Sequence, residues 1–199
     1  MNGKERIFRY TKIDENLAYL IGVYIGDGGI DRKQEYTQWS IDKDFIERVR
    51  YAYMQYLGKD LPEISYNNEK KLYVWRFGSK SYCEWIYGVT QGKSKIPDEI
   101  VNDKVLSKCC VEGLVDSEGW ISKSKKPLNH CGTHGYSMGF CITEKNIFEF
   151  VFNTFQKYNV KVSKWKPQKK GNYKPLYSMR INIRDFDRAD FYFCIRRKY

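Results

Sequence analysis

The chain has 199 residues, which is enough for one domain or for two small fused halves. Thirty-five Lys and Arg residues against 24 Asp and Glu residues give a net charge of +11, which favours a polyanionic partner, with nucleic acid as the first candidate. The opening MNGKERIFRY lacks the apolar core of a signal peptide and the longest apolar run, near Leu17 to Ile25, is too short to span a bilayer, so we expect an intracellular protein (cytoplasm, nucleoid or organelle matrix) with no membrane partner.

After a basic lead-in, the first predicted element is a helix over Glu15–Gly26 with Asp14 as its N-cap. Its sequence, LAYLIGVYIGDGG, is almost continuously apolar and ends in a pair of glycines that break the helix. One acid, Asp27, stands just before that pair.

The rest of the first half predicts two hairpins and two further helices. In chain order we expect strands at 30–34 and 36–41, a helix at 43–57, strands at 63–67 and 72–77, and a short helix at 80–89. Asp42 is placed as the N-cap of the middle helix and Gly58 ends it. In the second strand, Trp39 and Ile41 are expected to alternate inward. The first half therefore has the order αββαββα.

A polar, turn-forming stretch, TQGKSK at 90–95, is the best candidate for a linker. We therefore expect a first half over 1–90, a linker over 91–102 and a second half over 103–199. The second half is predicted to contain a helix at 103–117, strands at 120–124 and 136–142 around a long loop, a helix from the cap Thr143 to 158, strands at 160–167 and 177–183, and a closing helix at 184–197.

The second half repeats the first. Three motif positions recur 91 residues later, so that Gly22, Gly26 and Asp27 become Gly113, Ser117 and Glu118 within CVEGLVDSEG. Further along, YVWRF matches YSMRI at an offset of 104, which is larger because the loop at 125–135 is longer than its counterpart. A pattern that recurs once in each half indicates an internal duplication.

Small residues lie four apart along both motif helices, as Ala18, Gly22 and Gly26 in the first and Cys109, Gly113 and Ser117 in the second. Two such stripes allow helix backbones to approach unusually closely. This helix interface would bring the C-terminal ends of the helices together, and with them Asp27 and Glu118. Two carboxylates at one place, with no lysine adjacent in sequence, indicate a hard divalent cation.

Two buried helices that each end at a glycine C-cap are the alternative interpretation of the motifs. It accounts for Gly28 and Gly119. It does not account for an acid just before each cap, because negative charge at a helix C-terminus opposes the macrodipole.

The stretches LIGVYIGDG (20–28) and VEGLVDSEG (111–119) resemble the paired motifs of LAGLIDADG homing endonucleases, in the monomeric form that carries two pseudo-symmetric halves in one chain. The motifs, their separation and the surrounding repeat cover most of the chain. The resemblance implies an α+β fold of two αββαββα halves, in which the motif helices pack at the interface and two antiparallel sheets form a DNA-binding saddle. It also implies an intron-encoded enzyme.

The strand at 177–184 shows how such a sheet would meet a duplex. One face carries Tyr177, Met179, Ile181 and Ile183, which would point to the helices, and the other carries Ser178, Arg180, Asn182 and Arg184. A curved sheet with polar and basic side chains on its open face fits the major groove. An ordinary solvated sheet face is the alternative.

The resemblance implies Mg²⁺-dependent hydrolysis of both strands of double-stranded DNA across the minor groove, with short 3′ overhangs. Asp27 and Glu118 would each bind the divalent metal, together with the backbone carbonyls of Gly26 and Ser117. The metal would activate a water nucleophile and stabilise the leaving oxygen. One acid in each of two sites would give two strand cuts.

The chain departs from the family pattern where a Gln or a similar polar residue should end the second strand of each half. Lys43 and Glu144 take this position, or Asp42 and Glu144 if the register shifts by one, so the water-ordering role of that position is open. A basic residue is also expected near the scissile phosphate. The catalytic candidates are Lys43, Lys95 and Lys123, each with a phosphate clamp or a solvated lysine as the alternative.

Polar and basic residues of the strands and their loops are the expected DNA contacts. In the first half they are Arg32, Lys33, Gln34, Gln38, Ser40, Asn67, Lys70, Lys71 and Arg76. In the second half they are Lys123, Lys125, Lys126, Ser137, Lys164, Lys166, Lys169, Lys170, Arg180 and Asn182. Arg76 and Arg180 occupy equivalent positions, and arginine can bind guanine with two hydrogen bonds, whereas loop lysines are more suited to phosphates.

The six cysteines form no C-x-x-C pair, which is typical of reduced thiols in an intracellular protein. Four ligand-type residues do gather in the second half, namely His130, Cys131, His134 and Cys141. A structural zinc site is one interpretation, but their spacing matches no standard zinc motif, so a loop that faces DNA or is disordered is the plainer one.

The sequence therefore predicts a site-specific homing endonuclease that makes a metal-dependent double-strand break at a long target site. One alternative is an RNA maturase that assists splicing of its host intron, with host intron RNA as the partner. The other is a DNA-binding regulator built on the same fold, which is expected to carry an additional helix-turn-helix domain.

Overall fold

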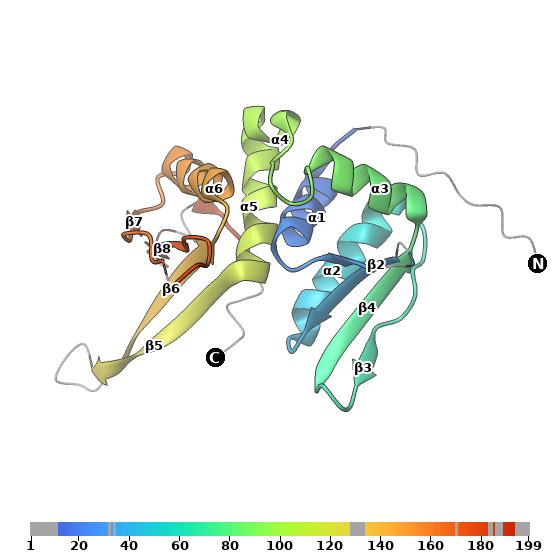
Figure 1. The fold of residues 1–199 in the computed structure, drawn as a ribbon, viewed down its shortest axis with the longest axis horizontal. Coiled ribbons are helices and arrows are strands. Elements are labelled where there is room, and N and C mark those ends of the chain that lie inside the picture. The colour runs from blue at the N-terminus through green and yellow to red at the C-terminus, as the bar shows by residue number, and fades with distance from the viewer. Residues whose placement is uncertain are drawn as a thin grey trace, which may run out of the picture.

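The computed structural model of this chain describes residues 12–31, 33, 35–127, 134–169, 171–182, 185 and 189–193, and of residues 123–127 and 134–137 it describes only the backbone. Two four-stranded antiparallel sheets lie on either side of a central pair of helices, α1 (Glu15–Gly26) and α5 (Lys104–Glu118). Figure 1 shows the sheets diverging downward from this pair, as the two sides of a saddle. The predicted α+β fold with the motif helices at the interface is confirmed.

The first half follows the predicted order of elements. After α1 come β1 (Gly29–Ile30), β2 (Glu35–Ser40), α2 (Lys43–Leu57), β3 (Ser65–Asn67), β4 (Leu72–Gly78) and α3 (Lys80–Val89). Local signals explain the bounds of the helices. The carboxylate of Asp14 accepts from the Leu17 N–H at 2.8 Å, Asp42 caps α2, and Gly58 ends α2 with φ at 59°.

The second half has the same sheet topology as the first. Its elements, after α5, are β5 (Gly119–Pro127), β6 (His134–Ile142), α6 (Lys145–Lys157), β7 (Val162–Lys164) and β8 (Tyr177–Ile181). The strand order β5-β6-β8-β7 repeats β1-β2-β4-β3, so the duplication seen in the motifs extends to the sheets. A short helix, α4 (Asp98–Asn102), precedes α5. The closing helix predicted at 184–197 lies largely outside the described residues, and residues 190–193, which are described, are not helical.

Helix α6 begins one residue later than predicted, because the N-cap residue is Glu144 rather than Thr143. Strand β6 stays paired with β8 through Ile142, so Thr143 forms the bend between strand and helix. The carbonyl of Glu144 then accepts from Phe148 at 3.0 Å. Glu144 therefore occupies the position that Asp42 has in the first half. Of the two predicted pairs, this is Asp42 with Glu144 and not Lys43 with Glu144.

The prediction that Trp39 and Ile41 point inward from β2 is wrong. Ile41 is 73% exposed and Trp39 is half-buried, whereas Tyr36 and Gln38 are fully buried. The reason is aromatic packing, since the ring of Tyr36 lies 5.2 Å from that of Tyr53 on α2. Because successive residues of a strand alternate between faces, this one anchored ring decides which face every residue of β2 presents.

One hydrophobic core runs through both halves, and the motif helices lie at its centre. Every residue of α1 from Leu17 to Ile25 is buried, which is what an apolar surface on all sides of a helix requires. Among the described residues, no helix combines the length and the apolar character that a membrane crossing would need. The core thus fixes α1 and α5 as the rigid axis of the molecule.

Candidate functional site

Helices α1 and α5 meet backbone to backbone at two reciprocal glycines. A Cβ atom on Gly22 would overlap the carbonyl oxygen of Cys110, and one on Gly113 would overlap the carbonyl oxygen of Tyr19. Any larger residue at either position would push the helices apart. The motif that recurs in the sequence therefore makes the same contact twice, because a glycine of each helix packs against a main-chain carbonyl of the other.

This packing brings the C-terminal ends of the two helices together. Asp27 is the C-cap of α1 and is exposed, while Glu118 is the last residue of α5 and is half-buried. Burial raises the pKa of Glu118, the negative charge of Asp27 raises it further, and Lys93 lowers it. The two motif carboxylates thus lie close enough to repel each other where water is partly excluded.

Lys93, a residue outside the predicted set, lies beside these carboxylates. Its ammonium donates to the carbonyl oxygen of Gly26 at 3.2 Å and lies 5.3 Å from the centre of the Tyr24 ring. Burial lowers the pKa of Lys93, whereas the charges of Asp27 and Glu118 raise it. Its place in the TQGKSK turn was the one sequence signal that pointed to it.

The three lysines predicted near the scissile phosphate have other partners or fall outside the description. Lys43 pairs with Glu47 at 2.9 Å on the exposed side of α2. Lys95, from the same turn as Lys93, pairs with Asp98 at 3.1 Å. The backbone of Lys123 lies in β5, and its side chain is outside the described part of the chain.

The donor atoms at the helix ends suit a hard divalent cation. Asp27 and Glu118 offer carboxylate oxygens, and Gly26 offers a main-chain carbonyl beside them. Mg²⁺ is typically held by one or two carboxylates and keeps several waters. The described residues assemble no cluster of three or more His, Cys, Asp or Glu side chains. A cation would also relieve the repulsion that raises the pKa of Glu118.

The candidate zinc ligands cannot be brought together from the described part of the chain. His130 and Cys131 lie outside it, and so does the side chain of His134. Cys141 is a half-buried free thiol whose pKa is raised by burial and by the charge of Glu118.

The open face of the first sheet carries a small groove of about 260 Å³ beside Arg76. Cross-strand pairing sets Thr37 opposite Arg76 and Trp39 opposite Val74, so these four side chains share that face. The ring of Trp39 lies 4.9 Å from the ammonium of Lys70 and 6.0 Å from the guanidinium carbon of Arg76. Two cations thus gather over one indole ring.

The second sheet carries Arg180 at the position equivalent to that of Arg76. Arg180 is exposed and lies opposite Gly139, which in turn lies opposite Trp120. The indole of Trp120 covers Gly139 so closely that a Cβ atom there would overlap the ring, and it lies 6.0 Å from the ring of Trp165. These tryptophans were not predicted as contacts, because nothing local distinguishes them from the fully buried Trp75.

The structure separates the predicted DNA contacts into groups by exposure. Exposed are Lys33, Lys70, Lys71, Arg76, Lys164, Lys166, Lys169, Arg180 and Asn182, and half-buried are Ser40 and Asn67. Outside the described residues lie Arg32, Gln34 and Lys170, together with the side chains of Lys123, Lys125, Lys126 and Ser137.

Two of the predicted contacts point away from the open faces. Gln38 is fully buried on the helix-facing side of β2, where its amide oxygen accepts from the hydroxyl of Tyr36 at 2.8 Å. Lys164 pairs with Glu149 of α6 at 2.6 Å, because it lies opposite the buried Met179 and so faces the helices. Both side chains therefore lie on the helix-facing sides of their sheets and not on the open faces.

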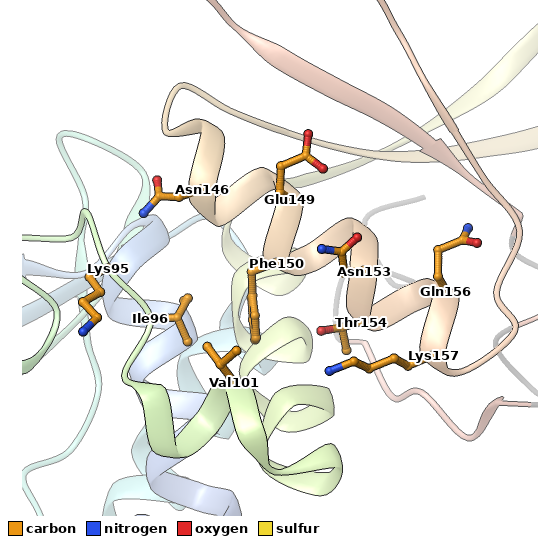
Figure 2. Close-up of a pocket in the computed structure, with 10 residues that line it drawn as sticks. All are labelled: Lys95, Ile96, Val101, Asn146, Glu149, Phe150, Asn153, Thr154, Gln156 and Lys157. Atoms are coloured by element: carbon orange, nitrogen blue, oxygen red, sulfur yellow. The ribbon is translucent and has the colours of Figure 1, made fainter.

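A cavity of about 600 Å³ lies between the 95–101 segment and α6, apart from the carboxylates. Figure 2 shows Ile96, Val101 and Phe150 converging on its apolar side. At one end the amide of Asn146 donates to the carbonyl of Ser94. Neither motif acid lines this cavity, so it does not belong to the candidate site.

No protein-family profile matches the chain, and two curated proteins to which it is similar in sequence are uncharacterised. One protein of Methanocaldococcus jannaschii is 27% identical over 169 residues, which cover 82% of this chain and 61% of that protein. A second protein of the same organism is 28% identical over 122 residues, which cover 57% of this chain and 42% of that protein. The chain therefore spans less than two thirds of the length of either relative.

Solved structures are similar over most of the chain. A variant of the homing endonuclease I-DmoI in complex with its target DNA and Mn is 15% identical, with a TM-score of 0.56 and coverage of 88% of this chain and 92% of that chain. The N-terminal LAGLIDADG domain of DUF199/WhiA is 16% identical, with a TM-score of 0.55 and coverage of 92% and 83%. At these identities the similarity concerns the fold. The chain thus has the LAGLIDADG fold, with both motifs in one chain, as the resemblance of its motifs predicted.

Proposed function

We propose that this protein is a site-specific homing endonuclease that makes a double-strand break in duplex DNA with the help of Mg²⁺. The observation that carries this proposal is the pair of carboxylates, Asp27 and Glu118, at the adjoining ends of α1 and α5. A protein that only binds DNA gains nothing from them, since they oppose the macrodipoles of both helices and repel phosphates. The similar fold of I-DmoI, solved with its target DNA and Mn, supports the proposal.

The arrangement suits hydrolysis because rigid helices hold the acids. Asp27 and Glu118, with the carbonyls of Gly26 and Ser117, would hold Mg²⁺, which when bound supplies charge neutralisation and an activated water. Each carboxylate would act at one strand, where a P–O bond forms between water and the phosphorus while one P–O bond of the backbone breaks, leaving a phosphate on one end and a hydroxyl on the other. Two pseudo-symmetric helices would in this way serve two strands.

The open faces of the sheets would supply the target recognition. Arg76 and Arg180 would bind base edges in the two halves of the site, because their guanidinium groups are exposed at equivalent places. Exposed lysines of the strand loops would contact phosphates and set the register of the duplex. The halves at 1–90 and 103–199, joined by the segment at 91–102, would each read one half of an asymmetric site as a monomer.

Sequence-specific DNA binding without cleavage is a second candidate function. Shape does not single out the endonuclease, because the TM-score to the WhiA domain is 0.55 and that to I-DmoI is 0.56. One observation favours binding without cleavage, because the ammonium of Lys93 already donates a hydrogen bond to the carbonyl oxygen of Gly26, one of the proposed metal ligands. The comparisons give no support to host intron RNA as a partner.

Cleavage of a plasmid that carries the uninterrupted host locus tests the proposal. With Mg²⁺ we expect linearisation at one position, and with EDTA none. Asp27→Asn and Glu118→Gln should each abolish linearisation and retain binding, because each removes one charged metal ligand. Glu84→Gln, an exposed acid of α3, is the matched control and should cut as the wild type does.

Undiminished linearisation by either motif variant would remove the catalytic role of that acid. Specific binding of the wild type with no cutting in Mg²⁺ or Mn²⁺ would establish the second candidate instead.

A further inference from the structure

The turn that carries Lys93 has an unusual backbone. Gln91, Gly92 and Lys93 are successive residues with φ values of 47°, 63° and 76°. Only glycine adopts this left-handed region readily, so two of the three residues are held in an unfavourable conformation. A turn of this kind persists when the surrounding structure fixes it, and such turns gather at functional sites.

Buried Thr90 holds the turn in place. Its hydroxyl donates to the carbonyl of Ile86 at 2.7 Å, and its carbonyl accepts from both Ser94 and Lys95 at 2.9 Å. The N–H of Gly92 donates to the carbonyl of Tyr87 at 2.9 Å, which continues the end of α3 into the turn. The direction of Lys93 is therefore set by several hydrogen bonds from outside its own side chain.

The turn directs Lys93 to the motif carboxylates. Its ammonium donates to the carbonyl of Gly26 at 3.2 Å and stands within the electrostatic reach of Asp27 and Glu118, across the ring of Tyr24. Lys95, two residues on, turns away to Asp98. Among the described residues, Lys93 thus presents its cation, from a strained turn of the segment between the halves, at the oxygen atoms that a divalent metal would use.

We propose that Lys93 is a positioning residue that serves as the resident cation of the two-carboxylate site, so that a divalent metal has to displace its ammonium from Gly26 in order to bind. This inference rests on the metal site of the proposed function. A fixed positive charge beside the carboxylates weakens the attraction of a second cation for them. A DNA phosphate would offer the displaced ammonium a new partner, which would couple metal binding to DNA binding.

Manganese binding without DNA tests this role. Free Mn²⁺ is titrated by its electron paramagnetic resonance signal against the wild type and against Lys93→Met, which keeps an unbranched side chain one atom shorter and removes its charge. We expect Lys93→Met to bind Mn²⁺ about tenfold more tightly, because one repelling charge near the protein surface is gone. Lys93→Arg should restore the affinity of the wild type, which a merely structural role of the stem would not predict.

Lys95→Met is the matched control, since it removes the same charge from the same turn but faces Asp98. It should bind Mn²⁺ as the wild type does. The gain in Lys93→Met should also disappear when Asp27→Asn is added, which shows that the ion lies at the motif acids. Lys93→Gln replaces Lys93→Met if the latter fails to fold by circular dichroism.

An affinity of Lys93→Met equal to or below that of the wild type would overturn the inference, and so would an equal gain in Lys95→Met. Because the titration contains no DNA, its outcome is separate from that of the cleavage assay. Tighter Mn²⁺ binding by Lys93→Met in a protein that cuts no DNA would support the inference and refute the nuclease. If the wild type cuts DNA and Lys93→Met binds Mn²⁺ no more tightly than the wild type, the nuclease is supported and the inference is refuted.

Discussion

Arg48 joins the two halves through a buried charge network. From α2 its guanidinium reaches two carboxylates of α5, at 2.8 Å to Glu112 and 2.7 Å to Asp116. Both acids are buried, at 7% and 1% exposure. The guanidinium carbon also lies 4.2 Å from the centre of the Tyr19 ring, and the hydroxyl of Tyr19 donates to Asp116 at 3.1 Å. One residue of the first half thus satisfies two buried charges of the second.

Arg48→Met should lower the free energy of unfolding by about 3–5 kcal/mol, because it leaves buried carboxylates without their guanidinium. Lys43→Met on the same helix is the control. It removes only the exposed pair with Glu47 and should leave the free energy of unfolding nearly unchanged. Urea unfolding measures both, and similar small losses in the two variants would contradict a stabilising network.

The loss in Arg48→Met should also shrink as the pH falls from 7 to 5. Burial raises the pKa of Glu112 above its ordinary value of 4.5, and Arg48 lowers it, so removing Arg48 raises it further. A carboxyl whose pKa is raised by folding stabilises the folded state while it is protonated, and that contribution to the free energy of unfolding is lost as the pH rises through the folded pKa. Urea midpoints at pH 5 and 7 provide the measurement, and a pH-independent loss would point to packing instead.

At the scale of elements, the pairing of α1 with α5 decides where the acids lie. The helices touch through Gly22 and Gly113, whose absent side chains leave room for the opposite backbone. Glycine in a helix is ordinarily destabilising by about 0.5–1 kcal/mol relative to alanine. At Gly22 and Gly113 this preference for alanine is outweighed by steric overlap, because a Cβ atom would meet main-chain atoms of the opposite helix that cannot move aside.

Gly22→Ala should therefore lower the free energy of unfolding by about 1–3 kcal/mol through overpacking, although alanine favours helices. Gly88→Ala is the matched control in α3, where a Cβ atom would meet nothing within 4 Å. It should raise the free energy of unfolding by about 0.4–1 kcal/mol. Thermal or urea unfolding tests both, and stabilisation by Gly22→Ala would mean that the helices are not in close contact.

At the scale of the whole molecule, two sheets present similar open faces on either side of the helix pair (Figure 1). Arg76 is exposed beside Trp39 in one, and Arg180 is exposed in the other, across Gly139 from Trp120. Two equivalent arginines at separate places would read separate halves of a long DNA site under the proposed function.

Arg180→Gln should weaken binding to the target by about 1–3 kcal/mol and relax the base preference in one half of the site only. Lys164→Gln removes the same charge from the same sheet, but its ammonium faces Glu149 of α6. It should leave the preferred sequence unchanged. Selection from randomised duplexes measures both, and a uniform loss in Arg180→Gln would indicate a phosphate contact rather than a base contact.

Some features of this molecule follow from short-range signals and were predictable. Asp14, Asp42 and Gly58 act on their own backbone neighbourhood, so the bounds of α1 and α2 could be deduced from sequence. The spacing of the two motifs likewise predicted both the helix pair and the meeting of Asp27 with Glu118, because small residues four apart let the two backbones approach closely.

Other features depend on contacts between residues far apart in the chain. Side chains alternate between the two faces of a strand, so β2 could turn either set toward the helices. The ring of Tyr36 packs among aromatic residues of α2 and β4, and this contact buries Gln38 on the same face. Lys93 reaches Gly26 through three left-handed residues, a backbone path that composition does not specify.

By itself, therefore, the sequence determined the duplication, the order of elements and the two acids, since these depend on local propensity and spacing. Only the tertiary structure decided which side chains face the open sheets and which cation accompanies the acids. Those outcomes depend on which distant surfaces pack together, and packing is decided by the whole fold rather than by any one segment.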